Sequence, residues 1–300
     1  MIEKMKKNKD RGYSMERLYR YLGVTRQALH KQKKAAEKWD ILARETLAKV
    51  AQIRKRHPKM GARVMYHTLG ITGMGINKFE RLISQNNLTV QIKKKRSITT
   101  DSRGSKRYPN LTNGLVLTGI NQLIVADITY YRVDNQFFYI FTLKDVYSQR
   151  VISLIASDNM KAINAMKAME DFNDVRGEGP FLLLIHHTDN GTQYDFGPYK
   201  DVLLSLGIEI SRAKNSLENG SSENLNRLIK HDYLFDHKRI KTVKQLQDEL
   251  DELKWKLNNE RAIKSLGYKT VVEFEEYILS IPEEERPRKQ LYDHRKEGKG

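Results

Sequence analysis

Three carboxylates stand at positions where they could bind metal ions. Asp189 directly follows the apolar run 181–185, and this run predicts a strand buried on both faces. Asn190 and Gly191 continue the chain with turn-forming residue types. In open α/β sheets, groups just beyond the end of a central strand bind ligands. A carboxylate in a turn also has an ordinary structural role, so Asp189 by itself does not decide between the two.

The other two carboxylates have structural explanations of their own. Asp127 interrupts the apolar run 123–128, so it either faces solvent by alternation or has a partner that makes its burial tolerable. Glu223 follows Ser221 and Ser222, one of which we expect to cap a helix. A carboxylate in a first helical turn also complements the helix dipole. Taken together, the three residues indicate one common site.

The elements that would position these carboxylates can be predicted from the pattern of apolar residues. Strands are predicted at 122–133, 137–146, 150–157, 181–185 and 208–211, and helices at 160–172, 197–206 and from 221 or 222 to 234. This order suits an α/β fold of the ribonuclease-H-like, retroviral integrase-like class. The first and fourth strands lie side by side in that fold, so Asp127 would approach Asp189.

The N-terminal half is predicted to be helical and basic. Residues 14–33 fit either a helix-turn-helix or an ordinary helical hairpin, with Thr25 as an N-cap. Lys93, Lys94, Lys95 and Arg96 form a basic run that could lie along phosphates. The predicted organisation is helix-turn-helix-like helices at 1–44, a helical DNA-binding unit at 45–97, a linker at 98–118, the catalytic domain at 119–282 and a mobile tail at 283–300. The helix predicted at 243–257 is amphipathic, and we expect it to pack on the catalytic domain.

Composition favours a polyanionic partner. The chain has 54 Lys and Arg against 37 Asp and Glu, a formal net charge of +17. Nucleic acid is the commonest partner of such a surface, although a merely basic protein or one docking on anionic lipid has the same balance. Absence of cysteine excludes disulfides and Cys-ligated metal sites. The sequence has no apolar run of membrane-spanning length and no signal core, so we expect a cytoplasmic, nucleoid-associated protein.

Several segments resemble those of DDE transposases. Residues 125–130 (Val-Ala-Asp-Ile-Thr-Tyr), 187–194 (His-Thr-Asp-Asn-Gly-Thr-Gln-Tyr) and 218–223 (Glu-Asn-Gly-Ser-Ser-Glu) resemble the three acidic blocks. They are most similar to the second-frame protein of the insertion-sequence family named IS-three, which is related to retroviral integrases. Segments 57–63, 258–261 and 265–270 also resemble that family. The departures are Ile124 for Trp, Glu218 for Asp, Ile263 for His and Val271 for Pro, and none touches the three carboxylates.

This resemblance implies a metal-dependent enzyme that acts on DNA. Asp127 would bridge two Mg²⁺ ions, while Asp189 and Glu223 would each complete one, and Mn²⁺ would substitute. Water would attack the phosphodiester first, and a DNA 3′ hydroxyl would attack second. Lys230 shares a helical face with Glu223. The residues assigned to DNA contact are Lys230, Arg227, Asn226 and the basic run 93–96.

Four further residues are expected around the carboxylates. His187 and Asn219 would orient ligands or backbone, although His187 equally fits a satisfied histidine at the edge of the core. Gln193 and Tyr194 would hold the loop after Asp189 or line the DNA groove.

The expected partners are the element ends, the target DNA, further copies of this chain on DNA, and a first-frame protein or its frameshift fusion. Two other functions fit the same sequence. One is a DNA-binding regulator with an inactive catalytic fold, and the other is a ribonuclease-H-like nuclease that cuts without joining.

Overall fold

The computed structural model describes residues 14–90, 108–133, 136–214, 216–235 and 240–294 of the 300-residue chain. By its internal contacts the chain divides into two units. The first contains residues up to 52 together with 71–88, and the second contains 53–70 together with the chain from 89 onward. The division falls inside the helical unit predicted at 45–97. Within the described ranges, no helix combines the length and apolar composition needed to cross a bilayer.

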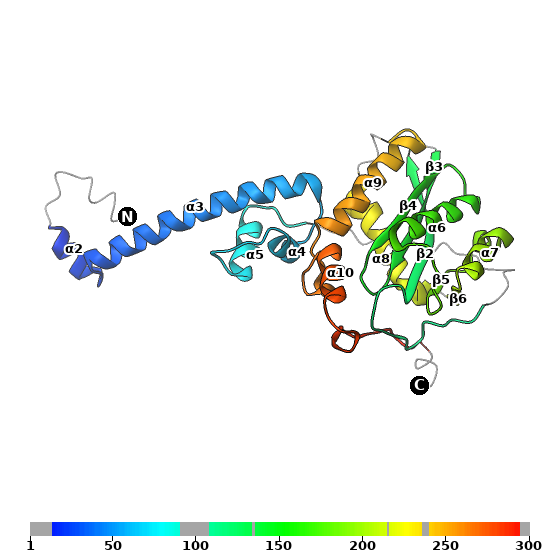
Figure 1. The fold of residues 1–300 in the computed structure, drawn as a ribbon. Coiled ribbons are helices and arrows are strands. Elements are labelled where there is room, and N and C mark those ends of the chain that lie inside the picture. The colour runs from blue at the N-terminus through cyan, green and yellow to red at the C-terminus, as the bar shows by residue number, and fades with distance from the viewer. Residues whose placement is uncertain (1–13, 91–107, 134–135, 215, 236–239, 295–300) are drawn as a thin grey trace. The chain divides into compact units, whose positions relative to one another are not determined.

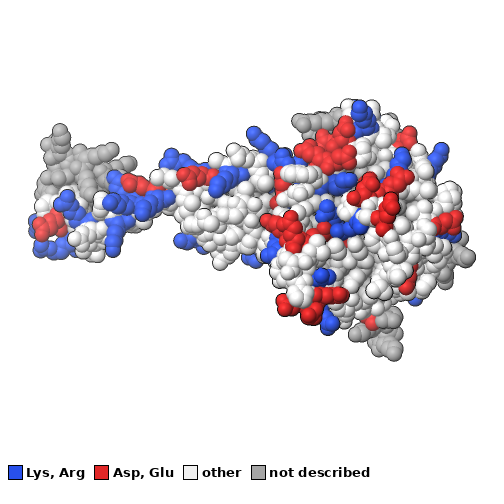
Figure 2. All heavy atoms as spheres, in the orientation of Figure 1, with Lys and Arg blue, Asp and Glu red and all other residues white. Residues whose placement is uncertain are grey.

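The first unit is helical and basic. It contains α2 (Met15–Tyr21), most of α3 (Arg26–Arg56) and α5 (Ile76–Gln85). Thr25 Oγ1 accepts a hydrogen bond from the Ala28 backbone N–H at 3.0 Å, which confirms the predicted N-cap. None of the residues of α2 is buried, whereas Val50 and Phe79 are fully buried. Lys and Arg side chains crowd the surface over the first turns of α3 (Figure 2).

A five-stranded mixed sheet forms the centre of the second unit (Figure 1). Its order is β4-β3-β2-β5-β6, where β2 pairs antiparallel with β3 and parallel with β5. The strands are β2 (Leu123–Val133), β3 (Gln136–Asp145), β4 (Val151–Ser157), β5 (Ile185–Thr188) and β6 (Glu209–Arg212). This order is that of the predicted ribonuclease-H-like fold, and the first and fourth predicted strands are neighbours.

Helices cover both faces of this sheet (Figure 1). On one face, α6 (Ile163–Arg176) and α7 (Gly197–Ser205) pack over a core that includes Ile124 and Phe141. On the other, α8 (Gly220–Arg227), the π-helical segment η3 (Leu228–Tyr233) and α9 (Val243–Asn259) pack over Tyr131 and Phe138. The four leucines of α9 are buried there, which confirms that this helix packs on the catalytic domain.

Shorter elements complete the second unit. They are α4 (Ala62–Thr68), α10 (Val271–Leu279), the paired strands β1 (Val116–Leu117) and β7 (Lys289–Gln290), and the 3₁₀ turns η1 (Thr192–Asp195), η2 (Ser216–Asn219), η5 (Lys264–Leu266) and η6 (Glu283–Glu285). Helix α10 packs on a third apolar cluster that includes Leu123, Val125 and Phe274.

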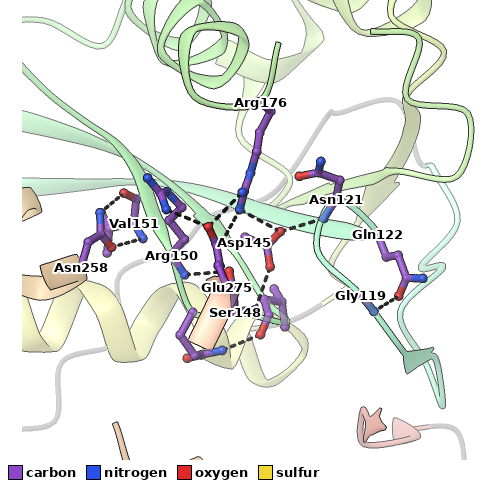
Figure 3. A network of polar contacts seen from close by, with 12 residues as sticks. Gly119, Asn121, Gln122, Asp145, Ser148, Arg150, Val151, Arg176, Asn258 and Glu275 are labelled. Atoms are coloured by element: carbon purple, nitrogen blue, oxygen red, sulfur yellow. Dashed lines mark hydrogen bonds and ion pairs between the residues drawn. The ribbon is translucent and has the colours of Figure 1, made fainter. Parts of the chain in front are cut away.

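Buried polar contacts link α6, α9 and α10 to the sheet or to one another (Figure 3). Arg176, at the end of α6, lies 2.6 Å from Glu275 of α10 and 3.6 Å from Asp145 of β3. Arg150 holds the second oxygen of Glu275 at 2.7 Å. The side-chain amide of Asn258, on α9, accepts from the Val151 backbone N–H with its oxygen and donates to the Val151 carbonyl with its nitrogen (Figure 3). Each buried charge therefore has an opposite charge beside it, as burial requires.

The strand predicted at 181–185 is wrong in its extent. Residues 181–184 form a turn, in which the Leu184 backbone N–H bonds to the Phe181 carbonyl at 3.0 Å. Leu182 and Leu183 are 70% and 81% exposed, so the apolar run is not a buried strand. Strand β5 begins at Ile185, opposite Leu123, because β2 offers its first partner there. Asp189 still follows directly after the strand.

Candidate active site

The register of β2 and β5 brings Asp127 and Asp189 together. The two strands run parallel, and their last paired residues are Ala126 and Thr188. Each aspartate is therefore one residue beyond the same pair, on strands that lie about 4.8 Å apart. This position is the C-terminal end of β5, where ligands bind in sheets of this kind, and it lies beside the middle of β2, which continues to Val133.

Asp127 is held by two hydrogen bonds. The side-chain amide of Asn226, from α8, donates to its Oδ2 at 2.7 Å, and the Ile128 backbone N–H donates to its Oδ1 at 2.9 Å. The carboxylate therefore has the partner that makes a charged group tolerable within an apolar strand. Its orientation depends on a helix that lies 99 residues further along the chain.

Asp189 is held by its own turn and by Arg212. The Gly191 backbone N–H donates to Asp189 Oδ1 at 3.0 Å. Arg212, at the end of β6, donates to the Asp189 carbonyl at 3.1 Å and to the hydroxyl of Thr188, and its guanidinium lies 3.3 Å from Asp195. Arg212 is only 3% exposed. Sequence analysis did not predict it.

Both aspartates have raised pKa values. Burial raises the pKa of Asp127 to about 7, and the charges of Asp189 and Glu223 add to the shift, while Lys230 opposes it. Burial also raises the pKa of Asp189, against the opposing effects of the Gly191 hydrogen bond and of Arg212. Negative charge therefore accumulates at this edge of the sheet, as it does where a cation is to be bound.

Glu223 lies on α8 and is exposed. The N-cap of α8 is Asn219, and its side chain makes no capping hydrogen bond. The expected capping by Ser221 or Ser222 is therefore wrong, because the helix begins before either residue. Among the residues that the structure describes, no group of three His, Asp and Glu side chains is close enough to hold a metal ion.

Lys230 lies in the π-helical segment η3. The prediction that Lys230 shares a face with Glu223 assumed α-helical spacing, and that spacing does not hold in η3. Its Nζ lies 5.0 Å from the centre of the Tyr130 ring. Burial lowers the pKa of Lys230, and Asp127 opposes this shift. Arg227 is half exposed, and its guanidinium lies 3.8 Å from Asp232.

The predicted DNA contact by Asn226 needs correction. Asn226 is buried, because its amide turns inward to Asp127. We therefore assign it to the positioning of Asp127. The basic run 93–96 lies outside the described residues.

The predicted neighbours of the carboxylates lie close to the end of β5. His187 is buried, with Nδ1 2.8 Å from Ser211 Oγ, and burial lowers its pKa to about 4. His187 and Asn219 both line a cavity of about 140 Å³. Tyr194 is 2% exposed and packs on Tyr199, so it holds the loop after Asp189. Gln193 is half-buried and donates to the Met160 sulfur at 3.8 Å.

Residues 118–215 match the family described as the integrase core domain. This span contains Asp127 and Asp189 and ends before Glu223. The uncharacterised 31 kDa protein of insertion element IS600 from Shigella sonnei is 31% identical over 192 residues, covering 62% of this chain and 70% of that protein. The chain belongs to the integrase-core family of insertion-sequence transposases. The resemblance to the IS-three family is thereby confirmed.

Further relatives of this transposase are themselves transposases of insertion elements. The transposase of insertion element IS629 from Shigella sonnei is 26% identical over 235 residues, covering 76% of this chain and 77% of the relative. The transposase of IS904 from Lactococcus lactis is 28% identical over 174 residues, 56% of this chain and 67% of the relative. The magnesium-bound catalytic core of the HTLV-2 integrase superposes with a TM-score of 0.42 at 20% identity, over 55% of this chain and 99% of that core.

Proposed function

We propose that this transposase cuts DNA at the ends of its insertion sequence in a Mg²⁺-dependent reaction and joins the freed 3′ hydroxyls to target DNA. The observation that carries the proposal is the adjacency of Asp127, within β2, and Asp189, directly after β5. Family membership supports the same reaction class.

The residues at this edge fit a magnesium site in their chemistry. Mg²⁺ prefers hard oxygen ligands, and Asp127, Asp189 and Glu223 supply carboxylate oxygens. Burial is the main cause of the raised pKa of Asp127, and the charges of Asp189 and Glu223 raise it further; a divalent cation would offset this repulsion. These three residues would hold the metal once the exposed side chain of Glu223 moves toward the two aspartates, and Mn²⁺ would substitute for Mg²⁺. When bound, a pair of such ions would stabilise both the attacking and the leaving oxygen of an in-line displacement.

Other side chains prepare the carboxylates and the DNA. Asn226 orients Asp127, and Arg212 orients the turn that carries Asp189. Lys230 lies beside Asp127, where it would contact the phosphate being cleaved. Arg227 and the basic run 93–96 would contact DNA further along, and His187 and Asn219 would support the backbone around the site.

The reaction needs no nucleophile from the protein. In the first step a water oxygen attacks the phosphorus, the bond from phosphorus to the 3′ oxygen breaks, and the element strand keeps a 3′ hydroxyl. In the second step that 3′ oxygen attacks a target phosphorus, and the target strand's own 3′ oxygen leaves with the proton. The first step is a hydrolysis, and in the second step one phosphodiester forms for the one broken, so no external energy source is required.

The proposed partners of this transposase are DNA ends, target DNA, further copies of this chain and a first-frame protein.

The test incubates the full chain with Mg²⁺, a labelled duplex of the element end and a plasmid target. Where an overlapping upstream frame precedes the gene, the fused product is tested as well. We expect nicked and joined products, and their loss in Asp189→Asn. Asp201→Asn, an exposed carboxylate on α7, is the matched control.

The products separate this function from its two rivals. Cleavage without joined products would identify a nuclease. Binding without cleavage, by the verified assembly, would identify a DNA-binding regulator. Either result would overturn the proposed function.

A further inference from the structure

Two segments outside the three acidic blocks meet in the second unit. His57 begins the segment 57–63 and is fully buried. Its Nδ1 lies 2.5 Å from the hydroxyl of Tyr233, and its Nε2 lies 3.0 Å from Oε2 of Glu260, in the segment 258–261. Both segments resemble the family, yet neither supplies a candidate metal ligand. Their contact therefore needs an explanation of its own.

The direction of these hydrogen bonds follows from the chemistry of the partners. An ionised carboxylate only accepts, so the Nε2–H of His57 donates to Glu260. Nδ1 of the neutral ring then accepts from the Tyr233 hydroxyl. Burial is the largest effect on His57 and lowers its pKa, which agrees with a neutral ring. Arg56 holds Glu260 in turn, through two contacts at 2.6 and 2.9 Å.

Lys59 contacts the C-terminal end of η3 at a second point. Its Nζ donates to the carbonyl of His231 at 2.6 Å and lies 4.0 Å from the centre of the Phe235 ring. The last carbonyls of a helix lack partners within the helix, and a lysine there satisfies one of them. Residues 57–59 therefore contact η3 at two points: Lys59 bonds to the His231 carbonyl, and His57 bonds to the Tyr233 side chain.

Segment η3 continues α8, the helix from which Asn226 bonds to Asp127. Helix α8 passes directly into η3, and α8 carries Glu223 and Asn226 while η3 carries Lys230. A π-helical turn is rare in proteins and is found mostly at functional sites. The Leu234 backbone N–H bonds to the Ile229 carbonyl, five residues earlier, at 2.8 Å. A geometry of this kind needs contacts from outside the helix, and His57 and Lys59 provide them.

We propose that His57 is a positioning residue for catalysis, which together with Lys59 fixes η3 so that α8 presents Glu223 and Asn226 to Asp127. The inference rests on the proposed function, because it assigns these contacts to the same metal site. It predicts that breaking the hydrogen bond between His57 and Tyr233 weakens metal binding by Asp127, Asp189 and Glu223.

The test measures Mn²⁺ binding by electron paramagnetic resonance in the full chain without DNA. His57→Gln keeps a donor at the position of Nε2 for Glu260 and has no acceptor at the position of Nδ1 for Tyr233, and Tyr233→Phe removes the hydroxyl alone. We expect each variant to raise the Kd for Mn²⁺ about fivefold, the effect of one buried hydrogen bond. The double variant should be no weaker than either single variant, because both remove the same bond. Tyr277→Phe, an exposed hydroxyl on α10, is the matched control and should bind as the wild type does.

A contact that merely stabilises the fold would lower the melting temperature without changing the Kd. Variants that bind Mn²⁺ as tightly as the wild type therefore overturn the inference and leave the proposed function standing. A wild-type chain that binds no more Mn²⁺ than Asp189→Asn overturns both. Lys59→Met keeps the stem of a half-exposed side chain, so it serves where a variant of the buried histidine does not fold. The same rise in Kd is expected for it.

Discussion

Asn226 donates a hydrogen bond to Asp127 across 2.7 Å, from helix α8 to strand β2. The bond joins the first predicted metal ligand to the helix that carries the third. Asn226 is buried, and among the described residues its Oδ1 has no partner. The amide therefore serves Asp127 alone, and the geometry of the candidate site depends on it.

Replacing Asn226 with alanine should slow cleavage about 10- to 100-fold, as loss of a group that orients a metal ligand does. Asp127 would keep only the backbone hydrogen bond to Oδ1. Single-turnover cleavage of an element-end duplex, measured over a range of Mg²⁺ concentrations, checks this. Asn224→Ala changes an exposed residue of the same helix and should cleave as the wild type does. Equal rates for the two variants would show that the bond does not position Asp127.

Replacing Arg212 with lysine should slow DNA cleavage. Its guanidinium serves the Asp189 carbonyl, the Thr188 hydroxyl and Asp195 at once, and a lysine ammonium is a point charge without that planar fork. Arg212→Lys should lower the cleavage rate roughly tenfold or more, because misplacing a catalytic group by about 1 Å has effects of this size. The measurement is single-turnover cleavage at saturating Mg²⁺.

The control for this substitution is Arg288→Lys, an exposed arginine after α10, which should leave the rate unchanged. Circular dichroism should show the native fold in both variants. A folded Arg212→Lys protein with the wild-type rate would contradict the assigned role.

Strand order could be predicted from the sequence, and with it the meeting of Asp127 and Asp189. Local patterns predicted the strands that carry these residues, and the fold that suits the order of elements places the first and fourth strands side by side. The limits of β5 could not be predicted, because a strand begins where a partner strand is available and not where an apolar run begins. Leu182 and Leu183 show this, as both are exposed despite their type.

The residues that hold the carboxylates could not be predicted for a related reason. Asn226 looks like a surface residue of a polar helix, and only tertiary packing turns it inward. Arg212 and His57 act on residues far away in sequence, so no spacing along the chain indicates their partners. The π-helical turn at η3 also has no local signature, and it changes which side chains share a face with Glu223.

Substituting Gly191 with alanine should impair the site without straining the backbone. Its φ of −62° is open to any residue. A Cβ at this position would lie 3.0 Å from Asp189 Oδ1 and 2.8 Å from Gln193 Oε1. The glutamine end can move away, whereas the aspartate is held by its turn. We expect cleavage to fall about tenfold, which corresponds to about 1.4 kcal/mol of transition-state stabilisation.

Gly197→Ala is the matched control, since a Cβ there meets nothing within 4 Å. Both variants are measured in the same single-turnover assay at two Mg²⁺ concentrations. Wild-type cleavage by Gly191→Ala would mean that the carboxylate of Asp189 tolerates displacement, and so does not hold the metal as proposed.

Glu275 should stabilise the fold in a pH-dependent way. Burial by itself would raise its pKa, but the hydrogen bonds and charges of Arg176 and Arg150 outweigh burial and lower the pKa below its ordinary value of 4.5. A group whose pKa is lowered by folding contributes stability above its unfolded pKa and loses that contribution as the pH falls through the folded pKa. Glu275→Gln should therefore cost roughly 3 kcal/mol of unfolding free energy near pH 7. The difference from the wild type should shrink below about pH 4.5.

Urea unfolding of both proteins at several pH values measures this difference. Asp145 is present in both proteins, so its own titration enters both curves. Glu276→Gln is the matched control, because Glu276 is the exposed neighbour on α10, and it should change stability by less than about 0.5 kcal/mol. A difference between wild type and Glu275→Gln that stays constant from pH 7 into the acid range would show that the charge of Glu275 contributes nothing. The pairs with Arg176 and Arg150 would then act only through their shape and neutral hydrogen bonds.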